Sequence, residues 1–332
     1  MNKNRTSQVR RALFASILAT GTLSAAPAAF AQAAAWPAKP IRLIVNFPPG
    51  GAADQLARMI GQPLSEALGQ PVVIENRAGA NGNIGGENVA RAQPDGYSLL
   101  MSSGGMVSVN PHIYAKMPFD PAKDLTPVAA AARVLVFLVV KPDYPASTAK
   151  AFLDDLKAKP GRRSFGSPGN GSSPHLAGEM MKSQAGVFAV HVPYRGAAPA
   201  LTDLLAGQID FLFDPGIAIP HVKSGKLKML AVGSPKRSPL FPDVPTLDEV
   251  GLKGFDADTV FGFYAPAGTP ADAVAKLNGE INRILATPAL RERIGALGGE
   301  PAPMSPTQFA AKAADDSKRF GAIIKERKIV GD

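Results

Sequence analysis

The chain has 332 residues, of which 45% are hydrophobic, and a formal net charge of +9 from 36 basic and 27 acidic residues. It contains no cysteine, which excludes disulfides, thiolate metal sites and lipid attachment through a cysteine. The basic residues are spread along the chain rather than gathered beside aromatic residues, which argues against a nucleic-acid partner.

The first 31 residues have the order of a secretory signal peptide. Basic residues without any acidic one precede an apolar stretch, and small residues follow up to Ala31. We expect cleavage after Ala31, export by the general secretory route rather than the twin-arginine route, and a location in the bacterial periplasm. Without this segment the net charge of +9 falls to about +5, and the remaining ~300 residues are enough for two domains.

Short β-branched runs alternate with helical patterns along the mature chain, which predicts an α/β fold with largely parallel sheets. In chain order we expect strand 41–47, helix 52–68, strand 71–75, helix 84–92, strands 97–102 and 134–140, helix 147–158, strand 164–167, helix 174–184, strand 188–192, helix 198–206, strands 209–213, 228–232 and 260–265, and helices 270–286, 289–297 and 306–327. Helix 52–68 shows the clearest spacing, because Leu56, Ile60, Leu64 and Leu68 recur every fourth residue. Pro63 lies inside this helix and is expected to kink it.

The turn at 47–54 reads Phe-Pro-Pro-Gly-Gly-Ala-Ala-Asp and joins the first strand to the first long helix. Its prolines cannot extend a strand ladder, and its glycines permit positive φ and a close approach of a ligand to the backbone. The unpaired N–H groups and the dipole of the following helix favour a negative charge. Because no Gly-Lys-Ser/Thr follows, the turn predicts an anion site that is not a nucleotide P-loop.

A similar arrangement recurs in the second half, where strand 164–167 runs into a turn rich in proline, glycine and serine before a helix. Ser173 suits the N-cap of that helix and Pro174 its first position. If each half forms its own sheet, both turns lie at the carboxyl ends of strands, where open α/β sheets bind ligands. The two turns would then hold one anion from opposite sides of a cleft.

These features and several further stretches resemble the Bug-type substrate-binding proteins of tripartite tricarboxylate transport systems. The similarity runs from Trp36 to the last helix and is carried by stretches 36–41, 75–77, 85–87, 175–179, 192–196, 203–210 and 244–246. It implies a two-lobed periplasmic-binding-protein fold of type II character, in which each lobe is a mostly parallel sheet flanked by helices and the ligand cleft lies between the lobes. Lobe 1 would comprise 36–133 plus 259–332, and lobe 2 would comprise 134–258.

The same resemblance implies a function. The two lobes would close on a small carboxylate, which could be a di- or tricarboxylate, an amino acid or an aromatic acid. Main-chain amides of both turns and ordered water would hold the carboxylate. A monomeric receptor would then deliver the ligand to the membrane permease subunits of a tripartite tricarboxylate transporter.

The candidate ligand-binding residues lie in the two turns and near the ends of neighbouring strands. They are Phe47, Gly50, Gly51, Ala52, Ala53, Asp54, Ser102, Ser103, Ser167, Asn170, Gly171, Ser172, Ser173, Tyr194, Arg195 and Asp214. Some have a structural alternative: Asp54 would also favour a helix N-terminus, and the serines of the second turn would also cap a helix. Arg195 could instead form a salt bridge, and Asp214 could belong to a hinge.

Catalysis finds little support in the sequence. The four histidines His112, His175, His191 and His221 form no HExxH pair, and no GxSxG nucleophile elbow is present. We therefore expect a binding protein without catalytic residues, metal or cofactor. The alternatives are a ligand-loaded sensor module that acts on a membrane sensor kinase, and a periplasmic hydrolase.

Overall fold

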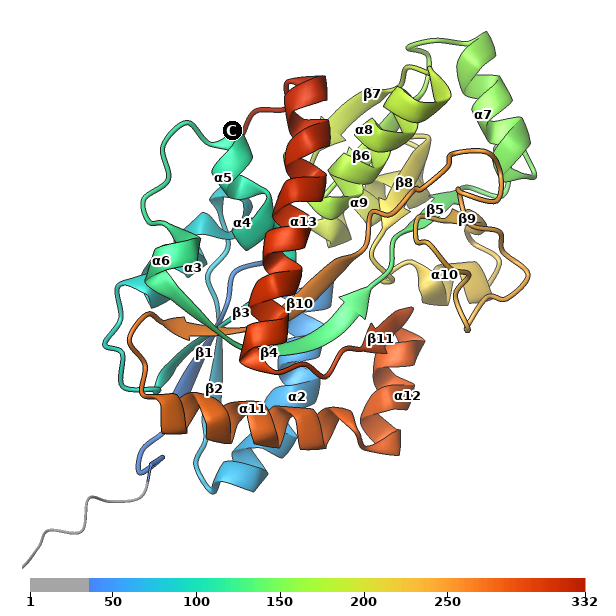
Figure 1. Cartoon of the computed structure of the whole chain (residues 1–332). Coiled ribbons are helices and arrows are strands. Elements are labelled where there is room, and N and C mark those ends of the chain that lie inside the picture. The colour runs from blue at the N-terminus through green and yellow to red at the C-terminus, as the bar shows by residue number, and fades with distance from the viewer. Residues whose placement is uncertain (1–35, 332) are drawn as a thin grey trace, which may run out of the picture. The chain divides into compact units, whose positions relative to one another are not determined.

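Two β-sheets organise the part of the chain that the computed structural model describes, residues 36–331 (Figure 1). The predicted signal peptide, 1–31, lies outside the described residues. The first sheet has the strand order β11-β4-β10-β3-β1-β2, with β1 (Ile41–Val45), β2 (Val72–Asn76), β3 (Ser98–Ser102), β4 (Leu125–Val134), β10 (Thr259–Pro266) and β11 (Gly299–Pro301). The second sheet has the order β7-β6-β8-β5-β9, with β5 (Phe137–Val140), β6 (Ser164–Ser167), β7 (Val190–Pro193), β8 (Phe211–Asp214) and β9 (Lys228–Val232).

Helices cover both faces of each sheet, as the α/β prediction requires. They are α2 (Ala52–Leu68), α3 (Asn83–Ala90), α4 (Gly104–Ser108), α5 (Asn110–Ile113), α6 (Pro121–Asp124), α7 (Ala149–Ala158), α8 (Ser173–Ala185), α9 (Ala197–Ala206), α10 (Ile219–Lys223), α11 (Ala271–Leu285), α12 (Pro288–Ala296) and α13 (Pro306–Arg327), with a 3₁₀ turn at Ala80–Gly82. The long helix α13 packs on β4 and α4 of the first sheet's layers and also on α8 beside the second sheet (Figure 1).

Alternating side chains of single strands explain this layering. In β5, Leu138 and Val140 enter the core shared with α7 and α8, whereas Phe137 and Val139 enter the core shared with α9 and α10. Every second residue of a strand points to the same face, so a continuous apolar run such as β5 can be buried on both faces. Residues 137–140 of the expected strand 134–140 are therefore buried on both faces.

Helix α2 confirms the clearest helical prediction. The residues at every fourth position, Leu56, Ile60, Leu64 and Leu68, are all buried. Pro63 lies inside the helix without ending it, and Gly69 closes the helix with left-handed dihedral angles. Strands β6 and β9 and helix α13 also have the predicted bounds, 164–167, 228–232 and 306–327.

The prediction of mostly parallel sheets is wrong, since both sheets are mixed. Strand β1 is parallel to β2 and β3, but β10 is antiparallel to β3 and β4, and β11 is antiparallel to β4. In the second sheet β6 is parallel to its neighbours and β5 is antiparallel to its own. The physical reason is the path of the chain, because β4 leaves the first sheet for the second and β10 returns beside it in the opposite direction.

The expected strand 134–140 is really a junction between the sheets. Strand β4 ends at Val134, and β5 begins at Phe137 in the other sheet, so Leu135 and Val136 form the first crossing segment. The chain returns through 233–258 to β10. We propose that the lobes are 36–133 plus 259–332 and 134–258, the division expected from the sequence.

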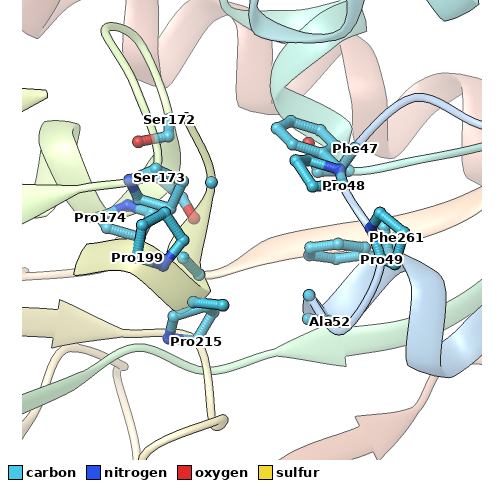
Figure 2. A pocket seen from close by; sticks show the side chains of 17 residues that line it. Phe47, Pro48, Pro49, Ala52, Ser172, Ser173, Pro174, Pro199, Pro215 and Phe261 are labelled. Carbon is cyan, nitrogen blue, oxygen red and sulfur yellow. The ribbon is translucent and has the colours of Figure 1, made fainter. Parts of the chain in front are cut away.

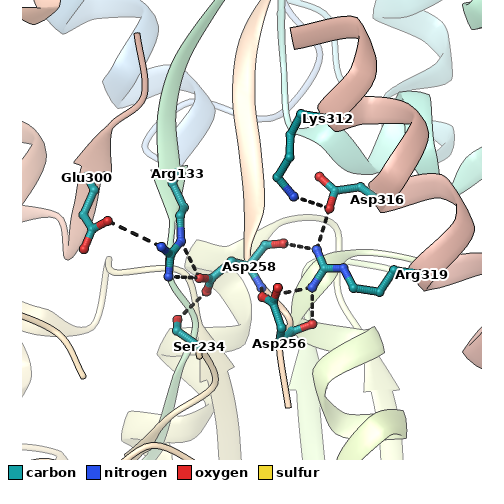
Figure 3. A network of polar contacts seen from close by, with 8 residues as sticks. All are labelled: Arg133, Ser234, Asp256, Asp258, Glu300, Lys312, Asp316 and Arg319. Atoms are coloured by element: carbon teal, nitrogen blue, oxygen red, sulfur yellow. Dashed lines mark hydrogen bonds and ion pairs between the residues drawn. The ribbon is translucent and has the colours of Figure 1, made fainter. Parts of the chain in front are cut away.

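A network of charged groups ties the two crossing segments together (Figure 3). Arg133, near the end of β4, lies 2.6 Å from the carboxylate of Asp258, which directly precedes β10. The hydroxyl of Ser234, after β9, donates to the same carboxylate. Arg319 of α13 donates to the main-chain oxygen of Asp258 at 2.8 Å and to Asp316 at 2.7 Å. The outgoing strand, the returning segment and α13 are therefore fixed to one another by paired charges.

We predict that Arg133→Gln lowers the free energy of unfolding by about 2–3 kcal/mol, because it leaves a buried carboxylate without its counter-ion. The Asp258 side chain is 6% exposed and that of Arg133 is 29% exposed. Because Arg133 is partly open to solvent, we expect a smaller loss of stability than for a fully buried pair. Denaturant unfolding measures the change. Adding Asp258→Asn should recover part of the loss.

The matched control is Arg237→Gln, since the pair Arg237–Glu249 has a similar separation of 2.9 Å but side chains 45% and 44% exposed. Its loss should be much smaller than that of Arg133→Gln, because solvent screens an exposed ion pair. Equal losses in the two single variants would contradict the role given to Arg133.

Candidate functional site

The two predicted turns line one cavity, which lies between the ends of strands from both sheets (Figure 2). The space outside protein atoms in this region is about 650 Å³, including a part that is open to solvent. On the side of the first sheet it is lined by 47–49, 51–53, Ser103 and Phe261, and on the side of the second sheet by Pro168, 172–174, 196–199 and Pro215. The starts of three helices, α2, α8 and α9, are therefore part of its wall.

The turn after β1 presents the start of α2 to the cavity. Gly50 has φ +81°, a left-handed conformation that favours glycine, whereas Gly51 is the extended N-cap with φ −76°. The first N–H groups of a helix have no acceptor inside it, and those of Ala52 and Ala53 donate to no other residue within 36–331. This turn thus offers main-chain donors to the cavity.

Asp54 shapes this turn and does not line the cavity. Its carboxylate accepts hydrogen bonds from the Gly50 N–H and Asn76 Nδ2, both at 2.9 Å, and pairs with Arg58 at 3.0 Å. Burial works against its charge, but the bonds from Arg58, Gly50 and Asn76 prevail and hold the pKa of the carboxyl below its usual value. Its negative charge is therefore already compensated by groups of its own turn.

The turn after β6 makes more hydrogen bonds within itself than the turn after β1 does. The N-cap of α8 is Ser172, one residue before the predicted Ser173, and its hydroxyl accepts from the His175 N–H at 3.4 Å. The Gly171 N–H donates to His175 Nδ1 at 3.0 Å, and Pro174 has no N–H. The Ser173 N–H is left as the donor of this turn without a partner among the described residues.

The start of a third helix, α9, also lines the cavity; the sequence analysis predicted this helix, at 198–206, but not its place in the site. The Gly196 N–H donates to the Pro168 oxygen at 3.1 Å, while those of Ala197 and Ala198 have no acceptor in the described part of the chain. A Cβ atom placed on Gly196 would lie 3.1 Å from Pro48 Cγ, so α9 starts in close contact with the turn of the first sheet. The stretch Gly-Ala-Ala-Pro, two residues after β7, marks the start of a helix in the sequence but not its place in the site.

Two stacked histidines hold the second turn in place. The rings of His175 and His191 lie 3.8 Å apart with planes 9° from parallel, and His191 Nε2 lies 2.7 Å from Ser167 Oγ. Burial, with a smaller effect of nearby Lys182, lowers the pKa of His175 to about 4. Burial and the neighbouring His175 lower that of His191 to about 3. Both rings are neutral at neutral pH, so His175 Nδ1 can accept from the turn.

Comparison with known proteins identifies the family of this chain. The model of the tripartite tricarboxylate transporter family receptor matches residues 56–329. The chain belongs to this receptor family. Protein BugT of Bordetella pertussis is 37% identical over 90% of this chain and 92% of its own length. A structure of an R. palustris protein with adipate is 33% identical, with a TM-score of 0.86 over 89% of this chain and 99% of that one. MatC from Rhodopseudomonas palustris with bound malate is 32% identical, with a TM-score of 0.81 over 87% and 99%.

The family confirms the resemblance and the two-lobed α/β fold expected from the sequence. It is a family of solute-binding receptors, and two of the solved relatives carry carboxylates. Within residues 36–331, no helix of this receptor is long and apolar enough to cross a membrane. The same region holds no group of three or more His, Asp or Glu side chains that could bind a metal.

Seven of the sixteen predicted ligand-binding residues line the receptor's cavity. They are Phe47, Gly51, Ala52, Ala53, Ser103, Ser172 and Ser173. The other nine, Gly50, Asp54, Ser102, Ser167, Asn170, Gly171, Tyr194, Arg195 and Asp214, are outside its lining. Their ligand contacts stay predictions of the sequence.

Two of these nine, Ser102 and Tyr194, are hydrogen-bonded to other protein groups. Ser102 is buried between the side chain of Asn46, at 2.9 Å, and the main-chain oxygen of Ser103, at 2.8 Å. The hydroxyl of Tyr194 donates to Asp203 at 2.7 Å, and burial together with this bond raises the pKa of Tyr194 to about 12. Arg195 is exposed next to the cavity residue Gly196.

Asp214 ends β8 and is almost completely buried, with 1% exposure. Its Oδ1 accepts from the N–H groups of Gly216 and Ala218 at 2.7 and 2.8 Å, while its Oδ2 has no partner among the described residues. Burial outweighs these two bonds and raises the pKa of Asp214 to about 6. Its neighbour Pro215 lines the cavity, so Asp214 fixes the backbone there.

We predict that His175→Phe frees the second turn while keeping the ring stack, because Phe cannot accept from the Gly171 N–H. Amide hydrogen exchange of peptides covering 168–173 should become at least tenfold faster. His221→Phe, on α10, is the control and should leave this exchange unchanged. Unchanged protection in His175→Phe would contradict the role of this ring.

We predict that Asp214→Asn makes the receptor more stable at pH 8 and not at pH 4. The pKa of Asp214 is raised from 3.8 to about 6 in the fold, so the free energy of unfolding of the native protein falls as pH rises through this range. The effect reaches about 3 kcal/mol at 1.36 kcal/mol per pKa unit. Thermal unfolding at both pH values measures it, with exposed Asp143→Asn as control. A stability gain of equal size at pH 4 would refute this account.

Proposed function

We propose that this chain is a periplasmic receptor that closes on a small carboxylate and delivers it to the permease subunits of a tripartite tricarboxylate transporter. In this proposal the receptor acts as a monomer and as a binding protein rather than an enzyme. The supporting observation is that five residues at three helix starts line one cavity, and that their main-chain N–H groups have no partner among the described residues. They are Ala52, Ala53, Ser173, Ala197 and Ala198.

Such donors suit a carboxylate for two reasons. A hydrogen bond from an N–H group to a charged acceptor contributes about 1.5–3 kcal/mol net. The positive end of each helix dipole adds to this, by about 0.3–1 kcal/mol at an exposed terminus. Because the donors lie at the start of α2, beside the first sheet, and at the starts of α8 and α9, beside the second, a ligand bound to all of them would join the two lobes. The adipate and malate of the related structures are consistent with this class of ligand.

A hydrolase is not favoured by the geometry. Ser167 and His191 form a Ser–His pair at 2.7 Å, but Ser167 is completely buried and cannot reach a substrate. The pair supports the second turn, as described above.

We predict that Ala52→Pro weakens carboxylate binding by about tenfold or more, which corresponds to the loss of one charge-assisted hydrogen bond. Ala52 is the first residue of α2, where proline is well tolerated, so the variant removes one N–H and keeps the helix. Isothermal titration calorimetry with the carboxylate that binds best in a thermal-shift screen measures the affinity.

The control is Ala271→Pro at the corresponding position of α11, which is exposed and does not line the cavity. Its affinity should equal that of the native protein. If Ala52→Pro also binds with native affinity, the α2 donor is not used. If the screen finds ligands without a carboxylate and none with one, the proposed function is wrong.

A further inference from the structure

Helix α8 of lobe 2 lies against the C-terminal half of α13, which is part of lobe 1 (Figure 1). On the basis of the proposed closure of the lobes on a ligand, we infer that this contact, called the α8–α13 latch from here on, forms when the lobes close and separates when they open. Arg327 of α13 is then a positioning residue for ligand binding, because it holds α8 where the start of that helix reaches the cavity.

The C-terminal half of α13 is fixed to lobe 1 through α5. His112 Nε2 of α5 lies 2.8 Å from Ser317 Oγ of α13. Beyond the end of α13, the Gly331 N–H donates to the main-chain oxygen of Ile113, the last residue of α5, at 2.8 Å. These two bonds lie on either side of 318–330, so this part of the chain moves together with lobe 1.

Apolar side chains of both lobes meet in the latch. Phe320 and Ile324 of α13 share one buried core with Leu176 of α8. The lobes also meet at the second ligand-binding turn, where a Cβ atom placed on Gly171 would lie 3.2 Å from Val109 Cγ1 of lobe 1. Burial of this apolar surface stabilises the closed arrangement, because opening the lobes would return the surface to water.

The polar contacts of the latch allow it to separate. Arg327 Nε lies 3.3 Å from Glu179 Oε2, and the Ser183 hydroxyl donates to the carboxylate of Glu326. Glu179 is buried, but it also pairs with Lys182 of its own helix, at 2.5 Å. The Glu179 carboxylate would therefore keep a counter-ion when α13 moves away, which avoids the large cost of leaving a buried charge unpaired.

Helix α8 connects the latch to the ligand site. Its first residue is Ser173, which lines the cavity and whose N–H has no partner among the described residues, and Glu179 lies in the middle of the same helix. Between them, His175 Nδ1 accepts from the Gly171 N–H at 3.0 Å, and His175 Nε2 lies 3.8 Å from Glu179 Oε1. A shift of α8 at the latch would therefore also move the Ser173 donor and the second turn.

A reversible cross-link tests whether the latch separates. The chain has no cysteine, so Ser183→Cys combined with Glu326→Cys gives a receptor with two thiols, one on each side of the latch. In the ligand-free mature receptor, joining these thiols with a short bis-methanethiosulfonate should lower the radius of gyration measured by small-angle X-ray scattering, and reductant should restore it. The same double variant blocked with methyl methanethiosulfonate is the control. A radius of gyration that the cross-link leaves unchanged overturns the inference, because the contact would then not depend on the opening of the lobes.

The proposed function fails by a different result. A native receptor that binds no carboxylate in the thermal-shift screen would refute that function, whereas the scattering experiment needs no ligand and decides the inference in either case.

Arg327→Gln provides the second test. It removes the ion pair between the lobes and leaves Glu179 with Lys182, so the closed arrangement loses stability and the Kd for the best-binding carboxylate should rise at least threefold in isothermal titration calorimetry. Arg327→Lys keeps the charge and should bring the Kd back toward the native value. Lys325→Gln, an exposed change of the same charge in the last turn of α13, is the control and should leave the Kd unchanged. A native Kd in Arg327→Gln, or an equal rise in Lys325→Gln, would contradict the role given to Arg327.

Discussion

The first N–H groups of a helix cannot be satisfied within that helix, and this constraint organises the site. Helices α2, α8 and α9 begin around one cavity, and five of their N–H groups have no acceptor among residues 36–331. The residues that carry them are alanine and serine, which have short side chains. Gly50 and Gly196 allow the chain to turn into α2 and α9 with positive φ. Unpaired donors beside an apolar wall are the physical basis of the proposed carboxylate site.

The charged side chains of the same region are used elsewhere. Asp54 is paired with Arg58 below the first turn, and Arg133 is paired with Asp258 where the chain crosses between the sheets. The cavity is thus left without charged side chains in its described lining, and its main-chain dipoles act in surroundings of low polarity, where electrostatic interactions are stronger. Specificity then depends on the shape and apolar character of the walls.

Much of the fold could be predicted because strong local patterns coincide with tertiary burial, as in α2 and in the strand at 164–167. Strand β4 was missed because its central residues, 129–132, are four alanines, which do not mark a strand as β-branched and aromatic residues do. In the site, the turns at 47–54 and 168–173 were recognised by glycine and proline. The contribution of α9 and of Phe261 to the cavity lining could not be recognised, because it depends on how segments far apart in the sequence come together in the fold.

The central claim is that a bound carboxylate is held by the N–H groups of Ala52, Ala53, Ser173, Ala197 and Ala198. Two-dimensional ¹H–¹⁵N NMR of the labelled mature receptor, recorded with and without a saturating amount of the carboxylate that binds best in the thermal-shift screen, observes these five amides directly. Our account predicts that their proton resonances move downfield, as expected for new hydrogen bonds to an anion. Five unmoved resonances in a ligand-saturated sample, with the shifts gathered on another surface, would contradict it.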